Sequence, residues 1–364
     1  MFYRRTTSPG GVASRAESGP SIDAGKKPRV SLRDWLLTIV IALSAAMIIR
    51  GFFIEAFRIP TSSMEKTLLA GDFVVVSKLR YGPRLPLTVG LPFLNLYVPG
   101  VELPGGRLPG FQDPNRGDVI VFNFPKEDAP IGRKTHYIKR IVGLPGDTLS
   151  IVDKVPYVNG RSVPLADDMQ QKWLAIRRTS RTFPIDRLVD AGAEEIGRVG
   201  EQLDGVAFQS TVALAQEVGG WSEIESVQPL VTPRNAARAG VVFPEGAGHV
   251  PDNYGPLHVP ARGDSVRLTR VNVPAYRDVV ERYEGHDLAV LGDEVFVDGE
   301  PAATYVVEKD YFFVMGDNRD SSFDSRIWGF VPWDHVVGKA TLIYFSWDRT
   351  GKRPRYDRLF TPIR

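Results

Sequence analysis

One apolar stretch near the start of the chain limits what this sequence can fold into more than any other feature. Residues 35–54, WLLTIVIALSAAMIIRGFFI, carry a single charge, at Arg50. A helix over this stretch would rise about 30 Å, which is the thickness of the hydrocarbon core of a bilayer. Arg50 lies near the end of the stretch, where a long side chain can reach the interface. We therefore predict a single membrane-spanning anchor at residues 35–54.

Two other interpretations of this stretch fit less well. A cleaved signal peptide has an apolar region of roughly 7–15 residues after a short basic start, whereas here residues 1–34 precede a longer apolar run. A buried core helix would show an amphipathic pattern, with polar residues along one side. A retained anchor is therefore the better interpretation.

The charges before the anchor predict its orientation. Basic residues outnumber acidic ones there: Arg4, Arg5, Arg15, Lys26, Lys27, Arg29 and Arg33 stand against Glu17, Asp23 and Asp34. Segments rich in Lys and Arg stay in the cytoplasm, so residues 1–34 are expected there and the chain after residue 54 outside it. Because residues 1–34 are polar and show no periodicity, we expect them to form a disordered cytoplasmic tail.

Composition excludes several kinds of chemistry. The chain has no Cys, which excludes a thiol nucleophile, a disulfide framework and a thiolate metal site. It has only 5 His, and none of them form an HExxH-type pair. A metal site or a Ser/His/Asp triad is thus unsupported, and we expect no metal and no cofactor. The net charge of +2 gives no indication of a nucleic-acid partner.

The chain after residue 54 has the pattern of a β-protein. Short β-branched or aromatic runs are separated by Gly, Pro and Asp, and two Asn-Gly or Asp-Gly pairs follow such runs. The predicted strands are 73–76, 118–122, 137–142, 148–152, 266–268, 311–315 and 340–345, with hairpins at 157–161 and 295–300. Alternating helices are missing, so a parallel α/β sheet is not expected. We predict a mainly β chain, with an antiparallel β-sheet ectodomain after one N-terminal transmembrane helix.

The segment directly after the anchor, RIPTSSME at 58–65, contains two adjacent serines. Ser62-x-x-Glu65 is a capping box, which predicts a short helix through Leu69 with Ser63 as its first residue. Free backbone N–H groups at a helix start favour developing negative charge, so a serine there could react. Most serines in this pattern are only caps, and the segment alone is weak support for catalysis.

Two further segments carry candidate chemistry. In 136–147, strand alternation places Lys139 on one face with Tyr137 and Ile141, and Arg140 on the other. Such a lysine either reaches solvent from an edge strand, or is buried, in which case its pKa falls and the neutral amine can act as a base. The polar segment 315–326 follows an aromatic strand. By itself it fits a structural turn or an acidic, calcium-like loop, although it lacks the EF-hand spacing.

Taken in order, these segments resemble the signature boxes of the bacterial type I signal peptidases. The matching stretches are RIPTSSMEKTLLAGDFVVVSK at 58–78, RGDVIVF at 116–122, HYIKRIVGLPGD at 136–147 and GDNRDSSFDSRIWGFVP at 316–332. The family also has an amino-terminal anchor before its first box. Four boxes and an anchor in the same order are far more specific than any one of them.

The resemblance implies a membrane-bound serine endopeptidase that cleaves signal peptides from exported preproteins without a cofactor. Ser63 would be the nucleophile and Lys139, in its neutral form, the general base. Ser322 would hydrogen-bond and orient Lys139. The Ser63 backbone N–H and the hydroxyl of Thr61, where the family often has serine, would form the oxyanion hole.

Supporting residues also follow from the resemblance. Asp324 and Arg326 would form an ion pair behind the site. Shallow pockets for the small residues before the cleaved bond would be lined by Phe57, Ile59, Pro60, Met64, Leu68, Val74, Val121, Tyr137 and Ile138. Some family members have two anchors and a disulfide, whereas this chain shows one anchor and no Cys.

The resemblance also suggests how the chain is divided. We expect a catalytic β core at 55–152 and 288–348, an inserted subdomain at 153–287 and a basic tail at 349–364. Segment 161–255 has no clear counterpart in the family's core, and a helical pattern is expected at 166–178. The proline-rich segment 83–114 is equally consistent with a loop that enters the membrane interface and with one packed on the sheet. The basic tail is expected to be solvated rather than bound to anionic lipid.

The expected partners are preprotein signal peptides and the lipid bilayer, with no nucleic acid. The expected location is the cell (inner) membrane, crossed once, with the catalytic domain in the periplasm or outside the cell. Two alternatives remain. A self-cleaving regulator with Ser/Lys chemistry would need a DNA-binding helix-turn-helix, where this chain has an anchor. A catalytically inactive membrane scaffold would not need intact Ser63, Lys139 and Ser322.

Overall fold

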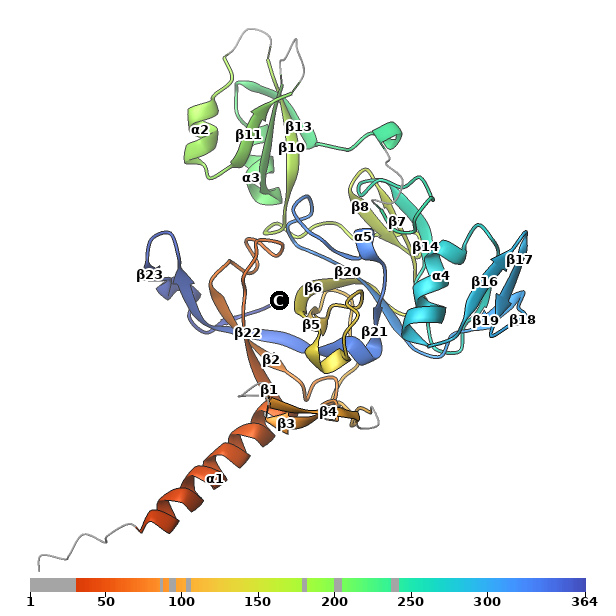
Figure 1. The fold of residues 1–364 in the computed structure, drawn as a ribbon. Coiled ribbons are helices and arrows are strands. Elements are labelled where there is room, and N and C mark those ends of the chain that lie inside the picture. The colour runs from red at the N-terminus through yellow and green to blue at the C-terminus, as the bar shows by residue number, and fades with distance from the viewer. Residues whose placement is uncertain are drawn as a thin grey trace, which may run out of the picture. The chain divides into compact units, whose positions relative to one another are not determined.

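The computed structural model describes residues 31–85, 88–91, 96–102, 106–178, 182–199, 205–236 and 242–364. The chain divides into two units, Met1–Ala46 and Met47–Arg364. We describe each unit by itself, with the element labels of Figure 1.

The apolar stretch near the N-terminus forms a helix. Helix α1 (Leu32–Ile48) is followed by one π-helical turn, η1 (Ile49–Phe53). Ser31 and Asp34 cap its start, because Asp34 N–H donates to Ser31 Oγ and Ser31 N–H donates to Asp34 Oδ2. None of its residues is buried, and the span Leu32–Phe53 is long and apolar enough to cross a membrane. The predicted apolar helix is confirmed.

A large antiparallel sheet organises the second unit (Figure 1). Its strand order is β1-β2-β22-β5-β6-β20-β21, and β23 and β24 also pair with β22. The strands are β1 (Ile54–Arg58), β2 (Asp72–Ser77), β5 (Val119–Asn123), β6 (His136–Gly143), β20 (Tyr311–Met315), β21 (Val331–Pro332), β22 (Val336–Asp348), β23 (Arg353–Pro354) and β24 (Thr361–Pro362). The prediction of a mainly antiparallel β chain is confirmed.

Strand β5 shows why the sheet is buried on both faces. All five of its residues are buried. Val119 and Val121 pack in one apolar cluster with residues of the β1–β2 connection, whereas Ile120 and Phe122 pack in a second cluster. Successive side chains of a strand point to opposite faces, so a continuous apolar run such as VIVF needs a core on each side. Strands β5 and β6 therefore form the rigid centre of the unit.

Smaller sheets surround this centre. One has the order β14-β7-β8-β9, another β16-β17-β18, and the pairs β15-β19 and β3-β4 are two-stranded. Their bounds are β3 (Thr88–Leu91), β4 (Leu96–Glu102), β7 (Thr148–Val152), β8 (Val155–Val158), β9 (Arg161–Ser162), β14 (Tyr254–His258), β15 (Ser265–Arg267), β16 (Leu288–Leu291), β17 (Glu294–Val297), β18 (Glu300–Pro301) and β19 (Thr304–Val306). The short helical segments are η3 (Ile131–Arg133), η4 (Arg234–Ala236), α4 (Val273–Arg277), η5 (Asp278–Tyr283), α5 (Ser325–Trp328), η6 (Trp333–His335) and η7 (Tyr356–Arg358). The proline-rich segment 83–114 falls partly outside the described residues, and its membrane contact stays a prediction.

Both predicted hairpins form at the expected turns. Asn159 and Gly160 have φ values of 51° and 77° between β8 and β9, and Asp298 and Gly299 have 52° and 81° between β17 and β18. Two consecutive positive φ values are the mark of a type I′ turn, which Asn-Gly and Asp-Gly favour. These two predictions are confirmed.

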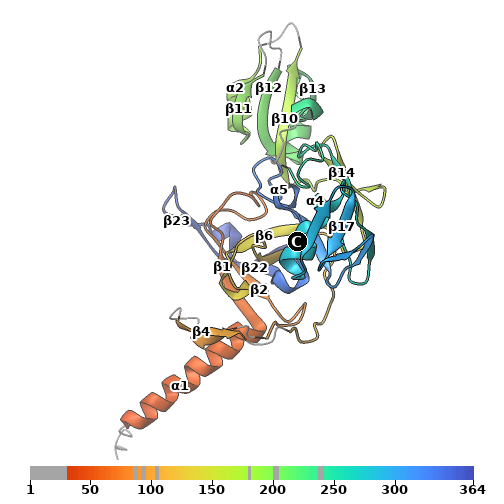
Figure 2. The ribbon, with the colours of Figure 1, turned by 45° about the vertical axis from the view of Figure 1, so that its right-hand side comes forward.

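A separate four-stranded sheet lies within the predicted insertion (Figure 2). Its order is β11-β12-β10-β13, with β10 (Gln170–Arg177), β11 (Glu194–Arg198), β12 (Gly205–Thr211) and β13 (Ile224–Pro229). Helices α2 (Ile185–Asp190) and α3 (Val212–Gly219) accompany it, and the group has its own apolar cluster. We call this sheet with its two helices the inserted sheet. Whether it ends at the predicted boundaries of the insertion stays a prediction.

The helix expected at 166–178 is wrong. Residues Gln170–Arg177 form strand β10, which pairs with β12 on one side and β13 on the other. A central strand gains backbone pairing and packing on both sides, and this outweighs the weak helix propensity of a short segment.

The solvated tail expected at 349–364 is also wrong. Strands β23 and β24 pair with β22, and Arg358 forms an ion pair with Asp72 at 2.6 Å. Asp72 is fully buried at the start of β2, and Arg358 also donates to the carbonyl of Thr67. A buried carboxylate needs such a partner, and the tail supplies it as the guanidinium of Arg358.

The tail should therefore contribute to stability. We predict that Arg358→Met lowers the free energy of unfolding by about 2–4 kcal/mol, because it leaves the Asp72 carboxylate buried without its cation. Denaturant unfolding of the chain in detergent measures this loss, with Arg349→Met at an exposed tail position as the matched control. Equal stability of the two variants would contradict the docked tail.

Candidate active site

Ser63 lies in the irregular loop that connects β1 and β2. Its ends are joined by backbone bonds, from Ile59 N–H to the Asp72 carbonyl and from Gly71 N–H to the Ile59 carbonyl, at 2.8 and 2.9 Å. Met64 and Leu68 are fully buried in the cluster below the loop. These two anchors hold Ser63 in a defined position.

The helix predicted from Ser62 through Leu69 is wrong. The segment forms turns, and Lys66 has a φ of 72°, in the left-handed region that an α-helix cannot contain. The buried positions of Met64 and Leu68 impose this backbone course, so a helix dipole is not available to Ser63.

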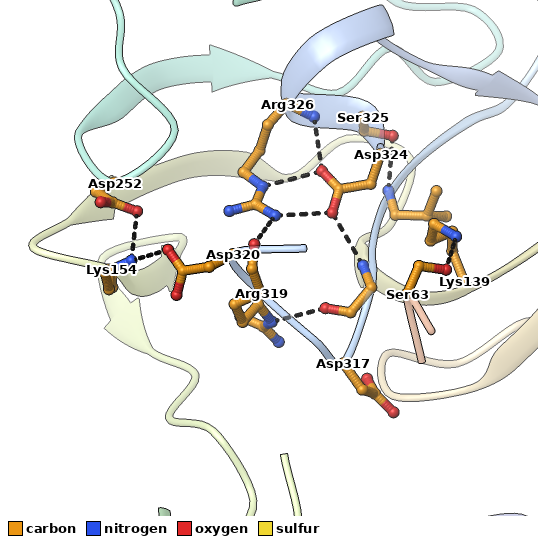
Figure 3. A network of polar contacts seen from close by, with 12 residues as sticks. Ser63, Lys139, Lys154, Asp252, Asp317, Arg319, Asp320, Asp324, Ser325 and Arg326 are labelled. Atoms are coloured by element: carbon orange, nitrogen blue, oxygen red, sulfur yellow. Dashed lines mark hydrogen bonds and ion pairs between the residues drawn. The ribbon is translucent and has the colours of Figure 1, made fainter. Parts of the chain in front are cut away.

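Ser63 and Lys139 are in direct contact although 76 positions separate them in the sequence (Figure 3). Lys139 lies in β6, between β5 and β20, and is 4% exposed. Its Nζ donates to Ser63 Oγ at 2.7 Å and to the Ile138 carbonyl at 2.8 Å. Nζ also lies 5.7 Å from the centroid of the Tyr137 ring, as expected for residues two apart on a strand.

Burial changes the acidity of this amine. Removal from water lowers the pKa of Lys139 to about 8, although the carboxylates of Asp324 and Asp317 act in the opposite direction. An amine with this pKa exists partly in its neutral form near neutral pH. A neutral amine at hydrogen-bond distance from a hydroxyl can take its proton.

An ion pair lies behind the Ser63–Lys139 contact. Arg326 Nε and Nη2 donate to the two oxygens of Asp324, both at 2.9 Å (Figure 3). Burial alone would raise the pKa of Asp324, but the guanidinium of Arg326 lowers it below its usual value. Asp324 also accepts from the backbone N–H of Gly316 at 3.0 Å. Together with the bond from Gly316, the ion pair thus joins the two ends of the loop between β20 and α5.

Two predicted residues do not make the expected contacts. Ser322 Oγ is buried within hydrogen-bonding reach of the Asp324 carboxylate and helps to lower its pKa, whereas Lys139 bonds to Ser63 and Ile138. The predicted bond from Ser322 to Lys139 is therefore not formed in this structure. Thr61 is exposed at the start of the loop. The oxyanion hole assigned to its hydroxyl stays a prediction.

Seven of the nine predicted pocket residues pack together. One apolar cluster contains Phe57, Ile59, Met64, Leu68, Val74, Val121 and Ile138. Tyr137 packs in the cluster on the other face, and Pro60 is exposed. Within the described part of the chain, no group of three His, Asp or Glu side chains could hold a metal ion.

Sequence reasoning missed a second ion pair at the site. Arg140 donates to both oxygens of Asp317, at 2.8 and 2.6 Å, and Thr67 Oγ1 donates to the same carboxylate at 2.7 Å. A charged side chain in the middle of a buried strand requires a partner of opposite charge. The position of Arg140 within β6 could therefore have predicted an acidic partner. Asp317 thereby ties the loop of Ser63 to β6.

Gly316 was also missed. A Cβ atom at this position would lie 2.2 Å from Ser322 Oγ and 2.4 Å from the Ser63 carbonyl oxygen. No other residue fits there without displacing backbone, so the close approach of the two loops requires glycine.

Lys154, outside the signature segments, holds another part of the same loop. It is buried between Asp252, at 3.1 Å, and Asp320 (Figure 3). Lys154 has a φ of 73° in the turn between β7 and β8, and no strand pattern in the sequence indicates that a residue of this turn is buried.

Comparison with known proteins assigns this arrangement to a family. The family described as "Signal peptidase, peptidase S26" matches residues 32–198 and 261–347, more than half of the chain. The chain belongs to this family. The matched ranges of the S26 peptidases include Ser63, Lys139 and the loop at 316–326, but not residues 199–260, which contain β12, α3 and β13.

Several curated relatives carry the name "Signal peptidase I". The chain is 28% identical over 382 aligned residues to the protein of Haemophilus influenzae, covering 96% of this chain and 83% of the relative. It is 27% identical to that of Aquifex aeolicus, covering 92% of both, and 28% identical to that of Pseudomonas aeruginosa, covering 87% and 74%. These alignments span most of each chain, so the similarity is not confined to the signature boxes.

The environment of Lys139 gives a prediction that does not depend on catalysis. We predict that the Cε resonance of Lys139 in lysine-labelled protein titrates with a midpoint near pH 8, because burial disfavours the charged amine. The resonance is assigned by its disappearance in Lys139→Met. A midpoint at the ordinary value of about 10.4 would show that the amine is solvated.

Proposed function

We propose that this S26 family member is a membrane-bound serine endopeptidase that cleaves signal peptides from exported preproteins, with Ser63 as nucleophile and Lys139 as general base. The 2.7 Å contact between Lys139 Nζ and Ser63 Oγ, in a site that lowers the pKa of the amine, supports this chemistry most directly. The shared name of the relatives supports the substrate class.

In the proposed reaction, Lys139 transfers protons in both acylation and deacylation. Neutral Lys139 takes the proton of Ser63 Oγ as this oxygen attacks the scissile carbonyl, and the protonated amine then gives it to the leaving amino group. The acyl group remains on Ser63. Lys139, neutral again, takes a proton from the water that attacks the ester, and gives this proton to Ser63 Oγ as the second product leaves.

Stabilisation of the oxyanion is assigned to donors next to Ser63. The Ser63 backbone N–H makes no hydrogen bond to another described residue and is available to the substrate. The Thr61 hydroxyl is the second proposed donor, and each donor would contribute about 3 kcal/mol to the transition state. Ser322, whose Oγ is buried next to Asp324, is proposed as the partner of Lys139 once Ser63 is acylated.

The anchor places this chemistry at a membrane surface. Residues 35–54 are proposed to cross the inner membrane once, with residues 1–34 in the cytoplasm and the chain after residue 54 on the other side. A signal peptide is itself held in the bilayer. Confinement of enzyme and substrate to one surface raises their effective concentration.

Cleavage of a preprotein in detergent tests the assignment. We expect Ser63→Ala and Lys139→Met each to lower kcat/KM at least about 1,000-fold, because one removes the nucleophile and the other its base. Ser62→Ala, at the exposed neighbouring serine, is the matched control and should cleave at the wild-type rate. Wild-type rates in both active-site variants would refute the Ser/Lys assignment. A wild-type protein that binds preprotein without turnover would favour the scaffold.

The pKa of Lys139 also predicts a pH dependence. Only the neutral amine is active, and with a pKa of about 8 its fraction rises about fivefold from pH 7 to pH 8 and levels off above pH 9. We therefore expect kcat/KM to rise with pH in the same proportion. A profile that is flat from pH 6 to 9, or that falls with rising pH, would be inconsistent with a neutral lysine base.

A further inference from the structure

Asn318 lies at the junction of the two loops that form the site. Its backbone N–H donates to the carbonyl of Ser63 at 3.1 Å, and its side-chain Nδ2 donates to the carbonyl of Ser62 at 3.2 Å. Asn318 is 1% exposed. One residue of the 316–322 loop thus holds the carbonyls of the two peptide groups on either side of the Ser63 Cα.

The inserted sheet supplies the partner of this asparagine. Gln209 of β12 donates from Nε2 to Asn318 Oδ1 at 3.3 Å, and its Oε1 accepts from Ser321 Oγ at 3.5 Å. Gln209 is 3% exposed. Its amide therefore bridges two residues of the loop that also carries Ser322.

Gln209 stabilises one orientation of the Asn318 amide. The end of this amide that faces Ser62 must be a donor, because it meets a carbonyl oxygen. The other end is then the carbonyl oxygen Oδ1, which needs a donor of its own in a buried place. The NH₂ group of Gln209 is that donor. Without it, Asn318 Oδ1 is buried without a donor, and the bond from Nδ2 to the Ser62 carbonyl is no longer held in place.

We propose that Gln209 is a positioning residue for catalysis, which acts through Asn318 on the backbone that carries Ser63. The proposal rests on the proposed Ser63/Lys139 chemistry. Residue 209 lies in 199–260, outside the ranges that match the family. The inserted sheet thereby contributes one buried side chain, that of Gln209, to the positioning of Ser63.

The other contacts of the inserted sheet with these loops are less suited to this role. Glu194 of β11 forms an ion pair with Lys66 at 2.6 Å, but the two side chains are 44% and 30% exposed. Exposed ion pairs in water contribute little. Gln170 meets the loop through its backbone, bonding to Asp317 and Arg319, so side-chain substitution does not remove the contact. Lys172 likewise uses its backbone N–H, which donates to Asp320, whereas Gln209 makes its contact through a buried side chain.

Substitution by a residue of similar size tests the proposal. In the full chain in detergent, we expect Gln209→Met to lower kcat for preprotein cleavage about 10- to 100-fold, as misplacement of a reacting group does, with KM within about twofold of the wild type. Gln228→Met, at an exposed glutamine of β13 in the same sheet, is the matched control and should keep the wild-type kcat. A kcat for Gln209→Met within about threefold of the wild type overturns the proposal.

A double substitution separates positioning from a purely structural role. In Asn318→Ala the amide that Gln209 orients is absent, so adding Gln209→Met should not lower kcat further. Losses that multiply would show that Gln209 acts independently of Asn318, and would overturn the proposal. Rates are expressed per folded protein, measured by size exclusion and near-UV circular dichroism. Gln209→Glu, which keeps the acceptor but lacks the donor, is expected to reproduce the loss of kcat if Gln209→Met is poorly folded.

The outcome also separates this inference from the proposed function. If Ser63→Ala cleaves at the wild-type rate, the Ser/Lys assignment fails and the role of Gln209 fails with it. If Ser63→Ala is inactive while Gln209→Met and Gln209→Glu keep the wild-type kcat, the catalytic assignment stands and only the positioning role is refuted.

Discussion

The site depends on one lysine amine that is kept out of water while it contacts one serine hydroxyl. Burial of Lys139 in a central strand makes the neutral amine accessible near neutral pH, and the fixed loop after β1 brings Ser63 Oγ to 2.7 Å from it. Neither condition is sufficient alone. A solvated lysine would be protonated, and a buried lysine without the hydroxyl would have no proton to move.

Much of the remaining structure holds this pair in place. The loop from Gly316 to Arg326 is closed by a buried ion pair of its own and tied to β6 by a second one. Its Asn318 supports the backbone at Ser63, and the inserted sheet orients Asn318 through Gln209. The preorganised polar groups cost stability to bury, and they limit the movement of the nucleophile. The inserted sheet is thus in contact, through Gln209, with the loop that supports Ser63.

The sequence predicted features that depend on local patterns and missed those that depend on distant partners. The hairpin at Asn159 and Gly160 follows from turn chemistry alone, whereas the burial of Lys139 is one of two outcomes that strand alternation left open. The helix expected from Ser62 fails because buried side chains in the loop impose a left-handed residue, and strand β10 forms because it is paired on both sides. The contact of Gln209 with Asn318 joins residues 109 positions apart, and no local pattern indicates it.

Detection of the covalent intermediate tests the central claim most directly. In a single-turnover reaction with a preprotein, quenched in acid and digested, we expect mass spectrometry to find the signal peptide as an ester on the peptide that contains Ser63. The same adduct should be absent when Lys139 is replaced by Met. An acyl group on a different residue would contradict Ser63 as the nucleophile. An equal amount of adduct in the wild type and in the Lys139 variant would contradict its activation by this lysine.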